Sequence, residues 1–254
     1  MPLTVHHLHN SQSERIAWLC EELNISYELK TYKRNPILAP PEYKALHPAG
    51  SAPIIQDTVS LSTDDNGENV KTLTLAESGA CVEYICQKHG NGRLFLPPSH
   101  HAYADFVYYF HWANGTFQPL LGRFMTLNAG SAGGIGSGGS QSPNPTANPN
   151  SNPMVALWHD RLKRSLGILD KRFKPKTDGG DGATWLAGDE FTAADIMVVF
   201  SLTTFRNWYA YSLHGYDGIL GYLARVGGRD GYKRAMAKVE PDMRLHLGAE
   251  VSSL

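Results

Sequence analysis

The sequence predicts an α/β domain followed by an all-helical domain. In the first 90 residues, strand-like and helix-like apolar periods alternate as β-α-β and then β-β-α, whereas after residue 98 almost every apolar pattern has helical spacing. A β-α-β unit of about 30 residues pairs its strands in parallel through a right-handed crossover, and a hairpin adds antiparallel strands. We therefore expect a mixed four-stranded sheet with helices at 1–90, a linker at 91–98, and a helical bundle at 99–254.

The composition limits what the protein can do. The 254 residues include 23 Lys and Arg against 24 Asp and Glu, a formal net charge of −1 that lacks the electrostatic footprint of a nucleic-acid or anionic-membrane binder. Apolar runs of about five residues fall far short of the ~20 that span a bilayer. The start of the chain lacks a signal-peptide pattern, and three cysteines are too few for a disulfide scaffold. We expect a reduced, cytoplasmic protein without a transmembrane segment.

The first domain contains four expected strands and three expected helices. The periodicity predicts strands at 3–8, 27–32, 53–56 and 72–75, and helices at 11–23, 42–46 and 77–89. A polar hairpin that contains Asp64 and Gly67 separates the last two strands.

The second domain contains five expected helices, at 103–127, 153–173, 192–211, 217–226 and 230–239. Between the first two lie residues 128–153, of which 20 are Gly, Ser, Asn or Pro. This composition cannot bury enough apolar area to offset the entropy of ordering, so we expect a flexible insertion; a substrate lid is the alternative.

The junction between the first strand and the first helix carries hydroxyl side chains. Ser11 and Glu14 have the S-x-x-E spacing of a capping box, which satisfies helix N-terminal amides. The same geometry suits an anion such as a thiolate, because free N–H groups and the positive end of the helix dipole meet there.

Two more junctions are expected at the same edge of the sheet. Pro53 follows Ala52 just before a strand, where an X-Pro bond is a candidate cis peptide. Glu77 and Ser78 open the next helix, where the hydroxyl can cap the helix or receive a ligand carboxylate, and Glu77 can receive an ammonium group. Ligands in α/β folds bind where such junctions converge.

Histidines 6, 7 and 9 suggest a metal site, but no carboxylate or cysteine lies at ligand spacing along the sequence, so we expect no metal.

These junctions, with the helical domain that follows, resemble the cytosolic glutathione transferases. The segments SQSERIAWLCEELNISYELKTYKRNPILAPPEYKALHPAGSAPII and LAESGACVEYI are similar to a serine-type microbial branch found in fungi and bacteria. In the second domain, Thr192 and Asp195 match the family's N-capping box at the start of a buried helix. The resemblance implies a thioredoxin-like N-terminal domain that binds glutathione.

The resemblance also implies roles for individual residues. Pro53 would be the cis-proline, with Ala52 pairing with the cysteinyl part of glutathione, and Glu77 with Ser78 would bind its γ-glutamyl part. Ser11 would donate to the thiolate, with Asn10 and Ser13 as rivals, and Arg15 belongs to the same motif as a structural residue. At the position of Ser51 many relatives have Lys or another polar donor, so the glycyl carboxylate can instead contact a side chain nearby: Lys33, Arg34 or His47.

The second substrate would meet the aromatic helix of the helical domain, in a pocket expected between the domains. Tyr108, His111, Trp112 and Gly115 suit a planar apolar ligand, although each aromatic side chain alone is typical of bundle core. The absence of a C-x-x-C motif and of a cysteine near Ser11 disfavours dithiol and deglutathionylating chemistry.

We therefore expect a homodimeric glutathione transferase that uses glutathione as co-substrate, requires no metal, and conjugates small apolar electrophiles in detoxification. The alternatives are a glutathione-dependent peroxidase, a non-catalytic ligand- or partner-binding protein of the same fold, and a biosynthetic enzyme.

Overall fold

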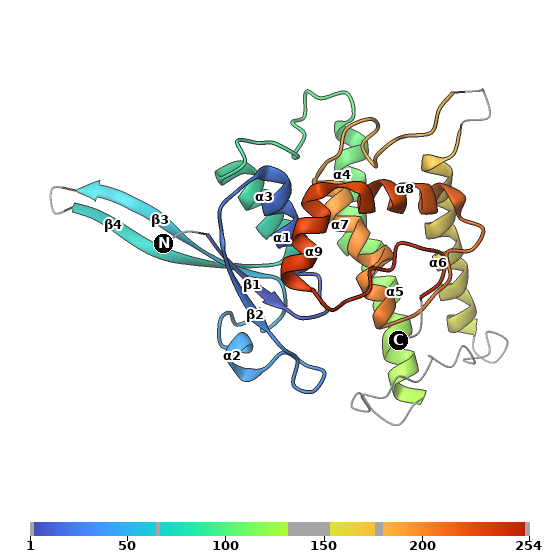
Figure 1. Cartoon of the computed structure of the whole chain (residues 1–254), viewed down its shortest axis with the longest axis horizontal. Helices are drawn as coiled ribbons and strands as arrows, with labels where there is room; N and C mark the ends of the chain where they lie inside the picture. The colour runs from blue at the N-terminus through green and yellow to red at the C-terminus, as the bar shows by residue number, and fades with distance from the viewer. Residues whose placement is uncertain (1–2, 65–66, 132–152, 176–179, 252–254) are drawn as a thin grey trace. The chain divides into compact units, whose positions relative to one another are not determined.

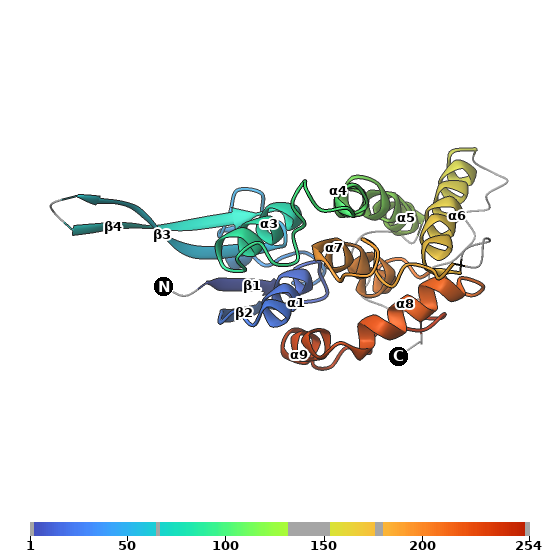
Figure 2. The ribbon, with the colours of Figure 1, turned by 90° about the horizontal axis from the view of Figure 1, so that it is seen from above.

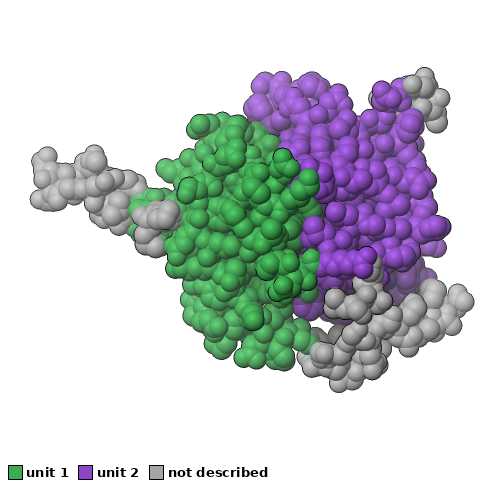
Figure 3. Space-filling model, in the orientation of Figure 1, with its two compact units in different colours: residues 1–95, 230–243 green, residues 96–229, 244–254 purple. Residues whose placement is uncertain are grey.

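The computed structural model describes residues 3–64, 67–131, 153–175 and 180–251. These residues form two compact units (Figure 3). Unit 1 comprises residues 1–95 and 230–243, and unit 2 comprises residues 96–229 and 244–254. Unit 1 thus also includes residues 230–243, which the sequence prediction places with the helical domain.

Unit 1 is built on the predicted mixed four-stranded sheet (Figure 1), which is confirmed. The strand order is β2-β1-β3-β4, with β1 parallel to β2 and antiparallel to β3, and with β3 antiparallel to β4. The strands are β1 (Thr4–Leu8), β2 (Glu28–Tyr32), β3 (Ile54–Asp64) and β4 (Gly67–Ala76).

The β3–β4 hairpin is longer than the sequence predicts. β1 pairs with β3 only up to Gln56, whereas β3 and β4 pair from Ile54 to Asp64. Both ribbon views show the outer part of the hairpin projecting beyond the sheet (Figures 1 and 2). Its strand signal is weak between residues 58 and 72, because Val59, Leu61 and Val70 are the only large apolar residues there among mostly polar side chains.

Four helices accompany this sheet: α1 (Glu14–Leu23), α2 (Pro41–Lys44), α3 (Ser78–Lys88) and α9 (Asp230–Val239). Alternation along β1 separates its two faces. Leu8 packs with Tyr43 of α2 and with Ile54 in one buried cluster, whereas His7 on the other face contacts residues of the α1 turn and Glu240.

The α9 helix packs against α1, and both views show the two helices side by side (Figures 1 and 2). Trp18 of α1 meets Tyr232 of α9 edge to face, with ring centroids 4.9 Å apart. Arg234 donates to the Glu21 carboxylate at 3.0 Å, and Lys238 lies 2.5 Å from the same group. These contacts fix the end of α9 beside β1.

Unit 2 is helical, as predicted. Its longer helices are α4 (Tyr103–Trp112), α5 (Gln118–Ser131), α6 (Pro153–Phe173), α7 (Ala193–Leu202) and α8 (Asp217–Gly228). A π-helical turn, Ala113–Phe117, divides the single helix predicted at 103–127. The helix predicted at 192–211 is too long, because α7 ends at Leu202 and a 3₁₀ turn, Thr204–Asn207, follows it. α5 continues to Ser131, so the first residues of the predicted insertion are helical; residues 132–152 lie outside the described residues.

Within the described ranges, no helix is both long enough and apolar enough to cross a membrane.

Candidate glutathione site

The turn between β1 and α1 directs its hydroxyl groups away from the helix. The N-cap of α1 is Ser13, without a side-chain capping bond, so the predicted cap at Ser11 is wrong. Asn10 has a left-handed backbone (φ 53°), and a turn closed by the Glu14 amide on the Ser11 carbonyl at 3.2 Å precedes the helix. Ser11 Oγ accepts from the Ser13 amide, at 3.2 Å, and the other bonds of the two hydroxyls lead to the strand and to each other.

Ser11 and Ser13 form a buried hydrogen-bonded pair. Their Oγ atoms are 2.7 Å apart, and their residues are 2% and 0% exposed. Ser11 Oγ donates to the Leu8 carbonyl at 2.7 Å, and Ser13 Oγ accepts from the Leu8 amide at 3.0 Å. Both serines are therefore interior residues, and Ser11 keeps slightly more exposure than Ser13.

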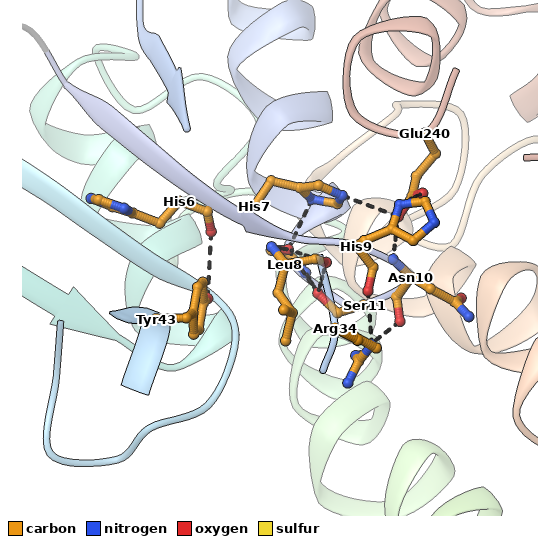
Figure 4. A network of polar contacts seen from close by, with 10 residues as sticks. His6, His7, Leu8, His9, Asn10, Ser11, Arg34, Tyr43 and Glu240 are labelled. Atoms are coloured by element: carbon orange, nitrogen blue, oxygen red, sulfur yellow. Dashed lines mark hydrogen bonds and ion pairs between the residues drawn. The ribbon is translucent and has the colours of Figure 1, made fainter. Parts of the chain in front are cut away.

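A histidine and a glutamate continue this network (Figure 4). Ser13 Oγ lies 2.9 Å from Nδ1 of His7, and Nε2 of the same ring lies 3.0 Å from Oε1 of Glu240, which follows α9. Both side chains are fully buried. Four side chains thus form one hydrogen-bonded series in the order Ser11, Ser13, His7, Glu240.

The Glu240 carboxylate also meets the β1–α1 turn. The Asn10 amide donates to Oε1, and Nδ1 of His9, a half-exposed side chain, lies 2.5 Å from Oε2. Arg34 donates to the carbonyl oxygens of His9 and Asn10 at 2.8 and 3.0 Å. Burial lowers the pKa of Arg34, and the nearby Glu240 charge opposes that shift.

The same residues form the one set of potential metal ligands found among the described residues: His7, His9 and Glu240, with ligand atoms within 4.8 Å of one another. The expectation that no carboxylate accompanies the histidines is wrong, because the fold supplies Glu240 from a distant part of the chain. The Asn10 amide donates a hydrogen bond to the Glu240 carboxylate, and the Arg34 cation partly neutralises its negative charge. Glu240 is therefore stabilised as a hydrogen-bonded carboxylate, which makes it a weaker ligand for a divalent cation. His6, on the other face, bonds to Tyr32 and Gln56.

Two side chains of the α1 segment connect the three predicted junctions. Gln12 Nε2 donates to the Ala52 carbonyl at 3.0 Å, beside the Ala52–Pro53 cis peptide bond. Arg15, which is fully buried, donates through Nη1 to Ser78 Oγ at 3.0 Å, at the start of α3. The sequence pattern identifies the junctions, and these bonds hold them within one unit.

Glu77 and Ser78 differ in their exposure. Ser78 is buried, whereas Glu77 is exposed and has a backbone φ of 78°. A glutamate with positive φ is uncommon, and such backbone strain concentrates at ligand-binding positions.

The residues considered for the glycyl carboxylate have different surroundings. Arg34 is occupied with the β1–α1 turn and with the Ile37 carbonyl. Nδ1 of His47, a half-buried residue, accepts from the Ala49 amide at 3.1 Å, while Lys33 and Ser51 are exposed.

The candidate electrophile residues in unit 2 divide into two groups. Trp112 is buried and stacks on Phe117, with ring centroids 4.7 Å apart, so it belongs to the core of that unit. Tyr108, His111 and Gly115 are exposed, and Gly115 lies in the π-helical turn.

At the start of α7, Thr192 and Asp195 form the capping box that the sequence indicates. Thr192 Oγ1 accepts from the Ala194 amide at 3.3 Å, and Asp195 Oδ2 accepts from the Thr192 amide at 2.9 Å. Asp195 also accepts from the Leu186 amide and the Tyr222 hydroxyl, both at 3.0 Å. Burial raises the pKa of this carboxyl to about 6, although hydrogen bonds from these three groups and from the Thr192 hydroxyl, at 3.3 Å, oppose the shift.

Comparison with known proteins identifies the family to which this chain belongs. The family model for the N-terminal domain of glutathione S-transferases matches residues 11–88, and that for the C-terminal domain matches residues 152–225. The two matches together span more than half of the chain. The chain belongs to the cytosolic glutathione S-transferase superfamily, and its fold is a thioredoxin-like domain with a helical domain.

Individual relatives agree with this assignment. The chain is 28% identical to glutathione S-transferase 3 of Schizosaccharomyces pombe over 98% of this chain and 92% of the relative. It is 32% identical to glutathione S-transferase 1 of Saccharomyces cerevisiae over 47% of this chain and 48% of that protein. The crystal structure of a glutathione S-transferase from Actinobacillus pleuropneumoniae is similar, with a TM-score of 0.69 and 26% identity over 96% of this chain and 95% of the other.

Sequence reasoning missed Glu240, His7 as a partner of Ser13, and the bridging role of Gln12. Glu240 has no local signal, because it acts 233 residues from His7 in the chain. Gln12 lies inside the recognised motif, but its partner is 40 residues away.

Proposed function

We propose that this protein is a glutathione transferase that binds glutathione on unit 1 and adds its thiolate to small apolar electrophiles. The relatives named glutathione S-transferase support this activity. A structural neighbour from Burkholderia graminis, with a TM-score of 0.62 and 20% identity over 96% of this chain and 90% of the other, is described with two glutathione molecules bound per subunit.

One observation carries the proposal: the α1 segment is hydrogen-bonded both to the cis-proline loop and to the start of α3. A tripeptide with three polar parts needs three binding segments at fixed spacing. Gln12 and Arg15 supply that spacing, and the buried Arg15 leaves little freedom to the Ser78 hydroxyl.

The proposed contacts follow from exposure and charge. Exposed Glu77 would receive the ammonium group of the γ-glutamyl part, and the α3 N-terminus with Ser78 would receive its carboxylate. Ala52 would pair with the cysteinyl backbone; its carbonyl now accepts from Gln12, so that side chain would move or share the acceptor. Ser51, His47 and Lys33 remain for the glycyl carboxylate, because Arg34 already binds the turn.

The sulfur would meet Ser11. A thiol with a pKa of ~8.5 is only a few per cent ionised at neutral pH, and a hydrogen bond to a charged acceptor contributes about 1.5–3 kcal/mol towards ionisation. Ser11 would turn its hydroxyl from the Leu8 carbonyl to the sulfur. Asn10, which is half-buried at the same turn, and Ser13, which is fully buried, are the rivals.

The electrophile would be received by the exposed side of α4 and the π-helical turn. Tyr108, His111 and Gly115 lie three and four positions apart, and a Cβ added at Gly115 would meet nothing within 4 Å. Single π-helical turns are frequent at functional sites.

Turnover with an aryl halide and with cumene hydroperoxide tests this proposal. Aryl-halide conjugation is expected to exceed peroxide reduction; dominant peroxide reduction would favour the peroxidase alternative. Retention on glutathione-agarose without turnover in either assay would favour a non-catalytic binding protein. A Ser78→Ala variant should lose glutathione affinity, whereas Ser26→Ala, at an exposed serine of unit 1 just before β2, is a matched control expected to retain it.

The cellular setting is part of the proposal. The three cysteines are buried and unpaired, and burial raises the pKa of Cys81 and Cys86 to about 12, which suits a reducing cytoplasm. We propose further that the protein is a homodimer and that it acts in detoxification. Light scattering of the purified protein tests the oligomeric state, and the electrophile sensitivity of a deletion strain tests the cellular role.

A further inference from the structure

The buried series from Ser11 to Glu240 ends on a carboxylate that the proposed thiolate stabilisation does not require. A serine hydroxyl donates one hydrogen bond to sulfur, and that alone explains neither His7 nor Glu240. We propose that Ser11, Ser13, His7 and Glu240 form a proton relay that removes the thiol proton of bound glutathione. This inference rests on the proposed function and adds a general base to it.

Each link has hydrogen-bond length. The Oγ atoms of Ser11 and Ser13 are 2.7 Å apart, Ser13 Oγ is 2.9 Å from His7 Nδ1, and His7 Nε2 is 3.0 Å from Glu240 Oε1. Figure 4 shows His7 directed towards Glu240, at the end of the strand that leads into the Ser11 turn. Ser13, His7 and Glu240 are fully buried, so water does not compete for these bonds.

The protonation states are consistent along the series once the Ser11 hydroxyl turns from the Leu8 carbonyl to Ser13 Oγ. With Nε2–H of His7 donating to Glu240, Nδ1 is an acceptor that faces the Ser13 hydroxyl. The carboxylate fixes this tautomer. It is itself held by the Asn10 amide, and α9 is fastened to α1 through Glu21.

The proton transfer balances without an added reactant. The thiol proton moves to Ser11 Oγ, the Ser11 proton moves to Ser13 Oγ, and the Ser13 proton moves to His7 Nδ1. The products are a thiolate that accepts a hydrogen bond from Ser11 and an imidazolium that donates to Glu240. After the thiolate forms its carbon–sulfur bond and the leaving group departs, the proton passes through the Glu240 carboxylate to His9, which is half-exposed, and from there to water.

His7 and Glu240 are positioning and proton-accepting residues that act through the serines. A purely structural role, in which they only fasten α9 to β1, is the competing explanation. The two differ in one respect: a relay affects ligands that carry a thiol proton, and a structural fastening affects every ligand of the site equally.

The experiment is stopped-flow mixing of the protein with glutathione, followed by the ultraviolet absorbance of the bound thiolate. In His7→Gln the rate of thiolate formation should fall by about 100-fold, the size of a general-base effect. Affinity for S-methylglutathione, which has no thiol proton, should be unchanged. His6→Gln is the matched control, because the neighbouring buried histidine bonds to Tyr32 and Gln56 outside the series, and it should retain the wild-type rate.

Equal losses with glutathione and S-methylglutathione, or a wild-type rate in His7→Gln, would overturn the relay. A wild-type rate in Ser11→Ala would overturn it as well. A wild-type protein that forms no thiolate would overturn the proposed function and the relay together, whereas the other outcomes leave transferase activity intact.

A measurement on the unmodified protein covers the case in which His7→Gln does not fold. Rates of thiolate formation in mixtures of light and heavy water should depend on the deuterium fraction along a curve, because several protons move together. A straight-line dependence means that one proton moves, and it would exclude the relay.

Discussion

The starts of α1 and α7 both carry a hydroxyl residue followed by a carboxylate three positions later, but they use these groups in opposite ways. At α7, Thr192 accepts from a helix amide and Asp195 returns a bond to Thr192, so the polar groups satisfy one another locally. At α1, the Ser11 and Ser13 side chains bond to the preceding strand and to His7. The two helix starts thus share a sequence pattern but differ in where their hydroxyl groups form hydrogen bonds.

The largest expected effect comes from removing the carboxylate of the capping box at the start of α7. Asp195→Ala leaves the amides of Leu186 and Thr192 and the Tyr222 hydroxyl without their buried acceptor, so the free energy of unfolding should fall by about 4 kcal/mol. Urea denaturation measures the loss. Asp189→Ala, an exposed carboxylate in the preceding loop, is the control and should have almost no effect; similar losses in both variants would contradict the assigned role.

The second prediction compares the removal of the hydroxyl group at each helix start. Ser11→Ala should lower aryl-halide turnover by about 100-fold, because the thiolate loses its donor, while glutathione binding largely persists. Thr192→Ala should lower the free energy of unfolding by about 1–2 kcal/mol and leave the turnover of the folded protein unchanged. Steady-state kinetics and urea denaturation of both variants test the pair. The contrast would fail if the two variants lost turnover and stability in the same proportion.

A third prediction uses the pKa of Asp195. Its folded-state value of about 6 lies above the usual 3.8, so burial favours the protonated form. The stability that this group contributes is fully present below the usual pKa and is lost as the pH rises through about 6. From about pH 7 to about pH 5 the free energy of unfolding should therefore gain about 1 kcal/mol from this group. Asp195→Asn should lack that gain in urea titrations at the two pH values.

The smallest expected effect concerns the attachment of α9. Burial raises the pKa of Glu21, but hydrogen bonds from Lys238, Arg234 and Tyr27 outweigh burial and hold it below its usual value. This stabilisation is present above the usual pKa and is lost as the pH falls through the lowered value. Glu21→Gln should cost about 1 kcal/mol at neutral pH, since its two cationic partners are half-exposed.

Hydrogen exchange of α9 amides should register the same change, because a weaker attachment opens that helix more often. Unaltered protection of α9 in Glu21→Gln would show that Glu21 does not hold the helix.

The two helix starts also show what the sequence could predict. The Thr192–Asp195 box is local, so its spacing alone indicates its geometry. The Ser11–Glu14 spacing is equally good, but His7 and the Leu8 amide compete for the hydroxyls there, and a tertiary partner 233 residues away completes the arrangement. The mixed sheet and most helix boundaries follow from periodicity. The π-helical turn at Ala113–Phe117 does not, because the apolar pattern runs on through it.

Unit 1 is discontinuous along the chain, which has a consequence for biosynthesis. The ribosome delivers residues 1–95 early, but Glu240 and the Tyr232 ring that covers Trp18 arrive only after nearly all of unit 2 has been made. An N-terminal nascent chain therefore contains the residues of the sheet, the Ala52–Pro53 loop and the serines before the residues that cover the end of β1 have been made. The His7–Glu240 contact is thus one of the last that synthesis makes available, and a chain that stops before α9 would contain the Ser11–Arg15 segment without this buried carboxylate.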